Sequence, residues 1–318
     1  MNNKIFEHLC KMSQKELKKY VTKQLERTHK DTVVVGDGYV YAQGSFPVLL
    51  VAHMDTVHKK SPKTFVYDME KGSVSSPQGI GGDDRCGVYM IFEIVKKFNC
   101  SVIFCEDEEI GGVGADKFLR TQLARDLTFN YAIEFDRKGK NDAVFYECDN
   151  PEFEDFITEE FYTTAYGTFS DISYLAPFLE CAAVNLSCGY YKAHTTDEYV
   201  VLKEMQDSID AACKILERTT ENDKFEYIEA KYHYGSGNYY SSGYDWYDDS
   251  YGDYYYSSST KSKEDSYYLI EYTDKNGETQ WYETYAYTRA EAVGSFCITN
   301  PHLPYDAIID IVCEENWA

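Results

Sequence analysis

The first two thirds of the chain alternate short apolar runs with longer amphipathic segments. Apolar runs such as PVLLVAH (47–53) and SVIFC (101–105) are followed by segments whose apolar residues recur at helical spacing, as in 84–98. Uniformly apolar runs are typical of strands buried on both faces, and their alternation with amphipathic helices favours a parallel sheet. The sequence therefore predicts an α/β fold, with a mostly parallel sheet covered by helices on both faces.

A tyrosine-rich segment interrupts this pattern. Ten of the 25 residues 232–256 are tyrosine, and most of the others are Gly, Ser or Asp. Because the segment lacks the aliphatic periodicity of a packed core, it cannot offset the entropy that is lost on ordering. We expect a main domain over residues 1–228, a low-complexity linker over 229–265 and a small domain over 266–318.

The small C-terminal domain is expected to be α+β. Two alternating runs meet at Asn276 and Gly277, a dipeptide typical of a β-hairpin, and Thr288 with Glu291 predicts the start of a short helix. The apolar run 306–314 would add a last strand and complete a ββαβ unit. Its aromatic residues could contact a protein partner, and the domain resembles small domains appended to proteins of phage and mobile elements.

The composition excludes several classes of partner. Lys and Arg number 31 against 54 Asp and Glu, so the net charge is −23. Such a surface repels nucleic-acid phosphates and anionic lipids, and no apolar stretch approaches the roughly 18 residues of a membrane span. The ten cysteines are dispersed singly and do not have the spacing of a disulfide scaffold. We expect no nucleic-acid or membrane partner, and reduced thiols in a cytoplasmic protein.

Residue types that bind metals follow the predicted strands of the main domain. They are His53 and Asp55, Asp83 and Asp84, the acidic run 106–109, Asp136, and His194. The carboxyl ends of parallel strands meet at one edge of a sheet, where ligands bind. Imidazole and carboxylate together suit zinc, or cobalt or manganese, better than calcium, which prefers oxygen ligands alone. The sequence therefore predicts a divalent-metal site at this edge.

Five motifs in order resemble those of the co-catalytic zinc peptidases. The motifs are VAHMDTV, GIGGDDRCG, EDEEIGGVGA, AIEFD and GYYKAHTTDE, and the resemblance extends from about residue 30 to residue 218. This group includes peptidase T, glutamate carboxypeptidases, acetylornithine deacetylase, succinyl-diaminopimelate desuccinylase and single-domain aminopeptidases. The resemblance implies a hydrolase of amide bonds that uses two zinc ions, most simply an exopeptidase of the aminopeptidase kind.

The resemblance also implies a ligand for each metal position. His53 and Asp136 would bind one metal ion, His194 and Glu109 would bind the other, and Asp83 would bridge the two. From the residues alone two alternatives stay open, because Asp84 is adjacent to Asp83 and Glu134 is two residues from Asp136.

Two further carboxylates take catalytic roles by the same resemblance. Glu108 would be the general base that takes a proton from the attacking water and passes it to the leaving amine. Base catalysis of this kind contributes roughly 10² to 10⁴-fold to the rate. Asp55 would orient a ligand imidazole or tune Glu108.

Four other residues are candidates for substrate binding. Arg137 and Lys192 flank presumed ligands and could bind a substrate carboxylate, or could only neutralise the acidic edge. Ser170 and Asp171 belong to GTFSDIS, which resembles a loop that lines the substrate cleft in this group, although an ordinary helix N-cap explains them equally well. The remaining histidines are expected at the surface: His8, His29, His58, His233 and His302.

The interval between the acidic ligand and the last histidine is short. Many members of the group insert a lid or dimerisation domain there, whereas residues 137–193 span only 57 positions and already contain predicted strands and a helix. We therefore expect an open, monomeric catalytic domain. Two alternative functions are a deacylase of N-acyl amino acids and a metal-binding interaction protein without catalysis.

Overall fold

The computed structural model divides into two compact units, Met1–Ala230 and Lys231–Ala318. It describes residues 2–167 and 169–230 and, toward the C-terminus, 266–275, 277–286, 292, 295, 296, 299, 300, 303 and 308–313. Most of the predicted linker lies outside the described residues, as do His233 and His302. The two units are described separately.

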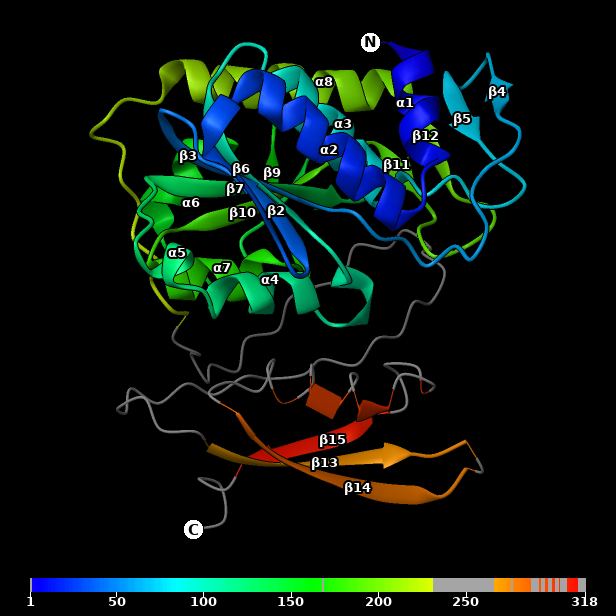
Figure 1. Ribbon diagram of the computed structural model, residues 1–318, viewed down its shortest axis with the longest axis vertical. Helices are drawn as coiled ribbons and strands as arrows, with labels where there is room; N and C mark the ends of the chain where they lie inside the picture. The colour runs from blue at the N-terminus through cyan, green and yellow to red at the C-terminus, as the bar shows by residue number, and fades with distance from the viewer. Residues whose placement is uncertain are drawn as a thin grey trace, which may run out of the picture. The chain divides into compact units, whose positions relative to one another are not determined.

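An eight-stranded mixed sheet forms the centre of the first unit (Figure 1). In spatial order its strands are β1 (Val33–Gly36), β2 (Tyr39–Ala42), β6 (Cys100–Cys105), β3 (Phe46–His53), β7 (Tyr131–Arg137), β10 (Ala183–Ser187), β8 (Asp142–Val144) and β9 (Thr163–Ala165). The central strands β6, β3, β7 and β10 are parallel. Antiparallel pairs join β1 to β2, β2 to β6 and β8 to β10. The predicted α/β class is therefore confirmed.

Helices cover both faces of this sheet, as Figure 1 shows. One layer contains α1 (Asn3–Cys10), α2 (Gln14–Thr28), α3 (Gly82–Ile94), α6 (Pro151–Thr158) and α8 (Leu202–Arg218). The other contains α4 (Val113–Leu119), α5 (Gln122–Arg125) and α7 (Ile172–Leu179). Short 3-10 helices span Lys30–Thr32 and Glu108–Ile110.

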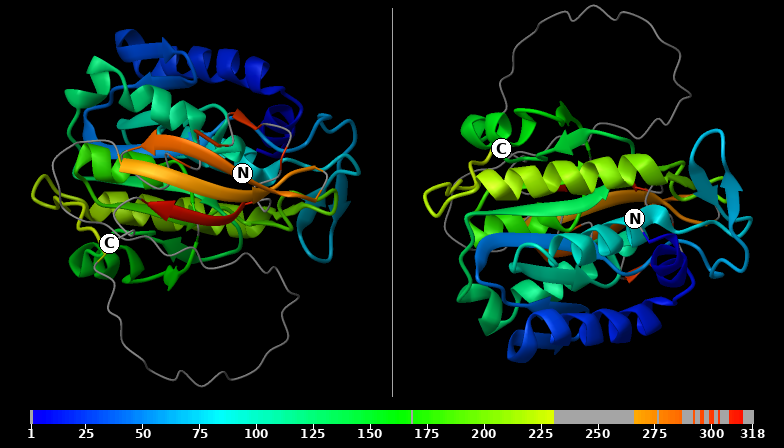
Figure 2. Two further views of the ribbon diagram at one scale, coloured as in Figure 1. Left: turned by 90° about the horizontal axis from the view of Figure 1, so that it is seen from below. Right: turned by 90° about the horizontal axis from the view of Figure 1, so that it is seen from above.

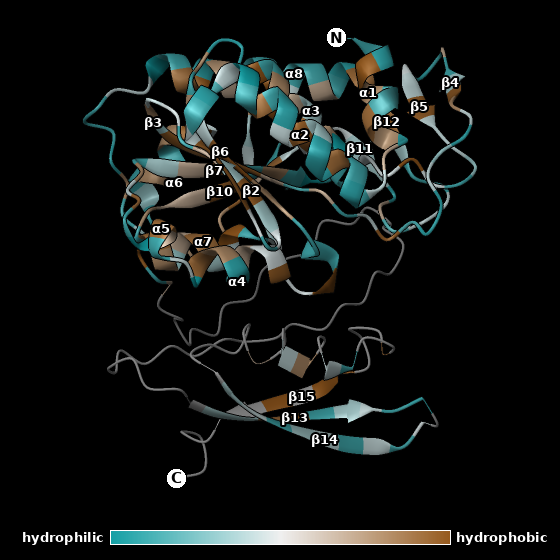
Figure 3. Ribbon diagram, viewed as in Figure 1, coloured by the Kyte–Doolittle hydropathy of each residue, from teal (hydrophilic) through white to brown (hydrophobic). Residues whose placement is uncertain are grey.

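Alternating side chains of the strands form two hydrophobic cores. On β3, Val48 and Leu50 face the layer that contains α3 and α8, whereas Leu49 and Val51 face the layer of α4 and α7. All four are fully buried, and burial of such a side chain contributes about 1.5–3 kcal/mol. Figure 3 shows hydrophilic residues on the outward faces of α2 and α8 and hydrophobic ones on the strands between the layers.

A second, antiparallel sheet lies beside the start of α3. Its order is β11 (Tyr190–Tyr191), β12 (Tyr199–Val201), β5 (Ser73–Ser75) and β4 (Val66–Asp68). The spacing of apolar residues in 197–219 predicts a helix that begins at Asp197. Residues 199–201 pair with β5 instead, so α8 begins only at Leu202. In the right-hand view of Figure 2, α8 is the long yellow-green helix that lies along the main sheet.

Residues after α8 still belong to the first unit. Isolated bridges pair Cys148 with Glu229 and Cys181 with Glu226. The ring of Phe225 lies 5.1 Å from the rings of Phe153 and Phe156, centroid to centroid. The chain therefore contributes to this core well beyond the end of α8.

The second unit contains a three-stranded antiparallel sheet. Its order is β14 (Thr279–Ala286), β13 (Ser266–Thr273) and β15 (Ile308–Cys313). β13 and β14 form the predicted hairpin, and Gly277 has a φ of 82° in the turn between them. A small core contains Tyr268, Ile270, Ala292, Phe296 and Ile308. Thr288 and Glu291, the predicted helix start, lie outside the described residues.

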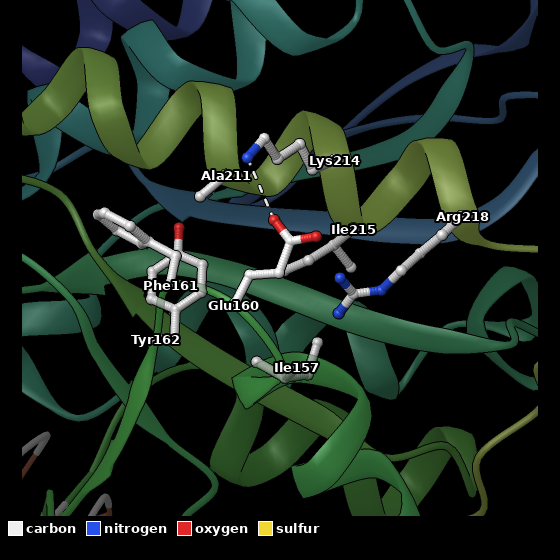
Figure 4. A pocket seen from close by; sticks show the side chains of 8 residues that line it. All are labelled: Ile157, Glu160, Phe161, Tyr162, Ala211, Lys214, Ile215 and Arg218. Atoms are coloured by element: carbon white, nitrogen blue, oxygen red, sulfur yellow. Dashed lines mark hydrogen bonds and ion pairs between the residues drawn. The ribbon is translucent and has the colours of Figure 1, made fainter.

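The first unit has a pocket away from the strand ends that bear the predicted ligands. A small pocket lies between α6, the turn after it and α8, where Lys214 reaches Glu160 (Figure 4). None of its lining residues is a predicted site residue.

Within the described part of the chain, no helix has both the length and the apolar character needed to cross a membrane.

Candidate metal centre

The predicted ligands converge at the carboxyl ends of the central strands. His53 is the last residue of β3, Glu109 follows β6 in a 3-10 helix, and Asp136 lies near the end of β7. Asp83 is at the start of α3, and His194 follows β11. Among the described residues these five side chains form two groups with metal-ligand atoms close together, and Asp83 belongs to both.

The first group surrounds the fully buried imidazole of His53. Its Nε2 atom lies 3.0 Å from Asp83 Oδ1 and 3.5 Å from Asp136 Oδ1. The opposite ring nitrogen, Nδ1, lies 3.1 Å from Asp55 Oδ1, so that carboxylate fixes the orientation of the ring. This leaves Nε2 facing the two other carboxylates.

The second group surrounds His194. Its Nε2 atom lies 3.2 Å from Asp83 Oδ2 and 2.9 Å from Glu109 Oε2. Asp83 therefore presents one carboxylate oxygen to each histidine. The side chain of His194 is 57% exposed, whereas that of Asp83 is 10% exposed. This group is thus open to solvent on the His194 side.

The donor set fits two divalent metal ions. Four ligands arranged tetrahedrally around zinc at about 2.0–2.2 Å lie roughly 3.3 Å from one another. The distances of 2.9–3.5 Å between the nitrogen and oxygen atoms of each group match that spacing. In addition, Glu109 Oε1 is buried and accepts no hydrogen bond from the described part of the chain. A bound cation would satisfy such an atom.

The electrostatics of the site also call for positive charge. Burial, followed by the charge of Asp83, raises the pKa of Asp136 to about 7. Burial and the same neighbour raise the pKa of Glu109 above its ordinary value. Burial alone would raise the pKa of Asp83 as well, but hydrogen bonds with His194 and His53 lower it. Bound cations would stabilise all three carboxylates in their ionised form.

Glu108 lies beside the first group without belonging to either. Its Oε2 atom is 4.0 Å from His53 Nε2, and its side chain is 11% exposed. Burial, then the carboxylates of Asp136 and Asp171, raise the pKa of Glu108 well above its ordinary value. A carboxyl group in this position could accept a proton from a water molecule and release it again.

Asp55 holds the acidic loop in place. Its Oδ1 and Oδ2 atoms each lie 3.0 Å from a backbone nitrogen, those of Glu108 and Glu109. Preceding them, Asp107 has a left-handed conformation with a φ of 62°. The loop thereby turns both glutamates toward the site from one short 3-10 helix.

The two alternatives to the ligand assignment have other contacts. Asp84 accepts hydrogen bonds from the backbone nitrogens of His53 and Gly87, at 3.2 and 2.8 Å, so its carboxylate faces main chain. The peptide bond between Asp83 and Asp84 is cis. Glu134 accepts a hydrogen bond from the Ser170 hydroxyl. Neither belongs to the metal-ligand groups found among the described residues.

The candidate substrate-binding residues are dispersed. Arg137 pairs with Asp142 at 3.2 Å, and Lys192 is exposed. The Ser170 hydroxyl also lies 3.2 Å from Asp136 Oδ2. Asp171 occupies the N-cap position of α7 but makes no capping hydrogen bond, so the N-cap explanation is wrong for its side chain. It is fully buried instead.

Sequence reasoning missed two polar residues near the site. Arg85 is almost fully buried and donates hydrogen bonds to the carbonyl oxygens of Met54 and Asp55, at 2.7 and 3.1 Å. Glu198 is fully buried, and His58 Nε2 lies 2.8 Å from its Oε2 atom. Both missed residues occur within motifs that carried the resemblance, GIGGDDRCG and GYYKAHTTDE.

Two histidines that were expected at the surface are not there. His58 has a side chain only 9% exposed because it pairs with Glu198. His29 is buried, and its Nε2 atom lies 2.8 Å from the carbonyl oxygen of Cys100. His8 is exposed, as expected.

Comparison with known proteins identifies the fold of the chain. Neither a protein-family model nor a curated protein matches it in sequence. Aminopeptidase PepT of Bacillus cereus superposes with a TM-score of 0.56 at 14% identity, over 67% of this chain and 96% of that one. Aminopeptidase APDkam598 of Desulfurococcus kamchatkensis gives 0.54 at 15% identity, over 68% and 94%. PhTET1-12s, a dodecamer in its crystal, gives 0.51 at 14% identity, over 66% and 97%.

Proposed function

We propose that this chain is a metal-dependent exopeptidase that removes amino-terminal residues from peptides. One observation carries the proposal: the two oxygens of Asp83 lie against the Nε2 atoms of His53 and His194, at 3.0 and 3.2 Å. A carboxylate between two imidazoles can bridge a pair of metal ions about 3.5–4 Å apart. The likeness in fold to two aminopeptidases supports the same class of reaction.

His53 and Asp136 would hold one ion, His194 and Glu109 the other, and Asp83 both. Two divalent ions, most simply zinc, would polarise the scissile carbonyl group and lower the pKa of water. Cobalt or manganese would suit the same nitrogen and oxygen donors. Every other step falls to residues of the chain itself.

Glu108 acts as the general base. Its carboxylate takes a proton from the attacking water and delivers it to the nitrogen of the leaving amine. Burial keeps its pKa raised, which suits a group that must accept and then release a proton. Asp55 supports this step because it holds the backbone nitrogen of Glu108 at 3.0 Å and the ring of His53 at 3.1 Å.

The substrate would approach on the exposed side of His194. Lys192, two residues before it and exposed, would attract a peptide carboxylate. Arg137 would contribute less, because Asp142 already pairs with it. Ser170, which reaches Asp136, and the buried Asp171 would shape the wall of the site from the start of α7.

We assign catalysis to residues 1–228 and a partner-binding role to 266–318, joined by the segment 229–265. We further propose a monomer, in contrast to the dodecamer of PhTET1-12s. Size-exclusion chromatography with light scattering tests the monomer.

The eight cysteines in the described part of the chain are buried free thiols, which supports a reducing, cytoplasmic environment.

A hydrolysis screen tests the function. The purified full-length chain is incubated with aminoacyl, short-peptide and N-acyl amino acid substrates, with and without a chelator. Release of amino-terminal residues that stops with chelator and returns with zinc supports the proposal. Turnover of N-acyl amino acids alone would make the protein a deacylase. Bound metal without any turnover would favour a metal-binding interaction protein.

A further inference from the structure

We propose that Glu198 is the positioning residue that fixes Asp83 between the two histidines. This inference rests on the proposed function, because it concerns the same two metal positions. Glu198 contacts no predicted ligand side chain through its carboxylate. It acts through the backbone of the loop that carries Asp83.

The carboxylate of Glu198 binds that loop at two points. Its Oε1 atom lies 3.0 Å from the backbone nitrogen of Asp83, and its Oε2 atom lies 2.8 Å from the backbone nitrogen of Gly81. Both hydrogen bonds are buried and charge-assisted, a kind that is shorter and stronger than a neutral one. Glu198 thereby sets the position from which the Asp83 side chain projects.

His58 completes the arrangement from a third loop. Its Nε2 atom lies 2.8 Å from Glu198 Oε2, so the imidazole donates to the same carboxylate that accepts from Gly81. His58 follows His53 by five residues, and Glu198 follows His194 by four. One buried carboxylate therefore connects the three segments that contain His53, Asp83 and His194.

The glycines of the loop make this close approach feasible. A Cβ atom on Gly82 would lie 2.7 Å from Val200 Cγ2 and 3.2 Å from Glu198 Oε1. A Cβ atom on Gly79 would lie 2.2 Å from the His58 ring. Only glycine at these positions lets the backbone lie against both side chains. The GIGG sequence is thus matched to Glu198 and His58.

Glu198 is isolated from water. Its side chain is fully buried, and strand β12 of the second antiparallel sheet begins at the next residue, Tyr199. Its carboxylate contacts the backbone nitrogens of Gly81 and Asp83 and the ring of His58, so it acts on the metal ions through Asp83. Its effect must be measured through the metal ions, and loss of a residue that orients ligands typically lowers metal affinity by roughly 10–100-fold.

The test compares two charge-removing substitutions at adjacent positions. Glu198→Gln keeps the size of the side chain. Its amide N–H group would face one of the three donors of Glu198, which are the backbone nitrogens of Gly81 and Asp83 and the ring of His58. Asp197→Asn removes the same charge from an exposed side chain next to it. Cobalt(II) is titrated into the metal-free full-length proteins, with calorimetry for affinity and visible absorption for ligand geometry. Thermal unfolding of each metal-free protein is measured in parallel.

We expect Glu198→Gln to weaken at least one cobalt site by roughly 10–100-fold and to alter its absorption, with the metal-free protein still folded. Asp197→Asn should bind cobalt as the parent does. His58→Ala should give a smaller loss than Glu198→Gln, because both backbone hydrogen bonds of Glu198 remain.

Three results would overturn this inference and leave the proposed function standing. Cobalt binding by Glu198→Gln that equals the parent's would show that Asp83 is positioned without it. An equal loss of cobalt affinity in Asp197→Asn would show that removal of one negative charge explains the effect. A Glu198→Gln protein that is unfolded without metal would show that the residue is merely structural. A parent chain that binds no cobalt would refute the proposed function together with this inference.

Discussion

The Oδ1 atom of Asp55 lies 3.0 Å from the backbone nitrogen of Glu108. The same atom lies 3.1 Å from His53 Nδ1, and Oδ2 lies 3.0 Å from the backbone nitrogen of Glu109. One carboxylate therefore orients a ligand of the first group, a ligand of the second group and the proposed base. The charge of His53, with hydrogen bonds from its ring and from these backbone groups, outweighs burial and lowers the pKa of Asp55, so it stays ionised.

Replacement of Asp55 should therefore affect binding and catalysis together. We expect Asp55→Asn to lower the affinity for zinc by roughly 10–100-fold and to reduce turnover even at saturating zinc. The amide can still accept from one backbone nitrogen, but it cannot serve all three donors. Zinc titration by calorimetry and kcat at saturating zinc are the two measurements. An unchanged kcat would mean that the loop holds Glu108 without Asp55.

Glu108 and Glu109 are adjacent, and the structure gives them different surroundings. We expect Glu108→Gln to lower kcat by roughly 10²–10⁴-fold, because the amide cannot accept the proton of water. Its metal content should stay at the parent's value, since Glu108 belongs to neither ligand group. Elemental analysis after dialysis checks the metal content. Glu109→Gln is the matched control and should lose metal first.

Asp83 is expected to decide how many ions are bound. Two divalent ions about 3.5 Å apart repel by about 19 kcal/mol at an effective dielectric constant near 20. A shared carboxylate offsets part of this repulsion. Asp83→Ala should therefore retain at most one tightly bound ion.

His53→Ala and His194→Ala should each weaken one site and leave the other more nearly intact. Asp84→Asn is the control for Asp83, because its carboxylate faces the backbone nitrogens of His53 and Gly87. Zinc titration into the dialysed proteins distinguishes these cases. Retention of two ions by Asp83→Ala and their loss from Asp84→Asn would move the bridge to Asp84.

The meeting of the candidate ligands at one edge of the sheet could be predicted because each signal is local. His53 and Asp136 end apolar runs, and such runs become buried parallel strands whose carboxyl ends meet at one edge. Asp83 could be preferred to Asp84 only through the resemblance. Composition and spacing treat two adjacent aspartates alike, whereas their backbone angles and hydrogen bonds differ in the structure.

The partners of buried polar residues could not be predicted. Glu198 and His58 are 140 positions apart, and their contact depends on how β5 pairs with β12. The helical pattern after His194 concealed that pairing, because 199–201 suit a strand and a helix start equally well. The burial of His29 could not be predicted either, because its partner is the carbonyl oxygen of Cys100, 71 positions away in the sequence.

Metal binding should strengthen as pH rises. In the metal-free protein the pKa of Asp136 is raised from 3.8 to about 7 by burial and the charge of Asp83. Between these pH values the folded protein holds a proton that the unfolded chain has released. Asp136 therefore makes the free energy of unfolding of the metal-free protein fall as pH rises from about 4 to about 7. Metal ions must displace the same proton. Zinc affinity should thus be higher at about pH 7.5 than at about pH 5.5, and calorimetry at both values checks it. Equal affinities would show that zinc binding displaces no proton from Asp136, or from Glu109 and His194, whose pKa values are also raised.

The boundary of the first unit can be tested by truncation. A chain that ends at Ala230 keeps the bridges of Glu226 and Glu229 and the aromatic contacts of Phe225. A chain that ends at Asn222 loses them, and removal of one packed aromatic side chain costs on the order of 2 kcal/mol. We expect the longer chain to bind zinc and turn over small peptides as the full-length protein does, and the shorter one to unfold at a lower temperature. Thermal unfolding with and without zinc measures the difference. Loss of metal by the chain that ends at Ala230 would mean that residues 231–318 support the site.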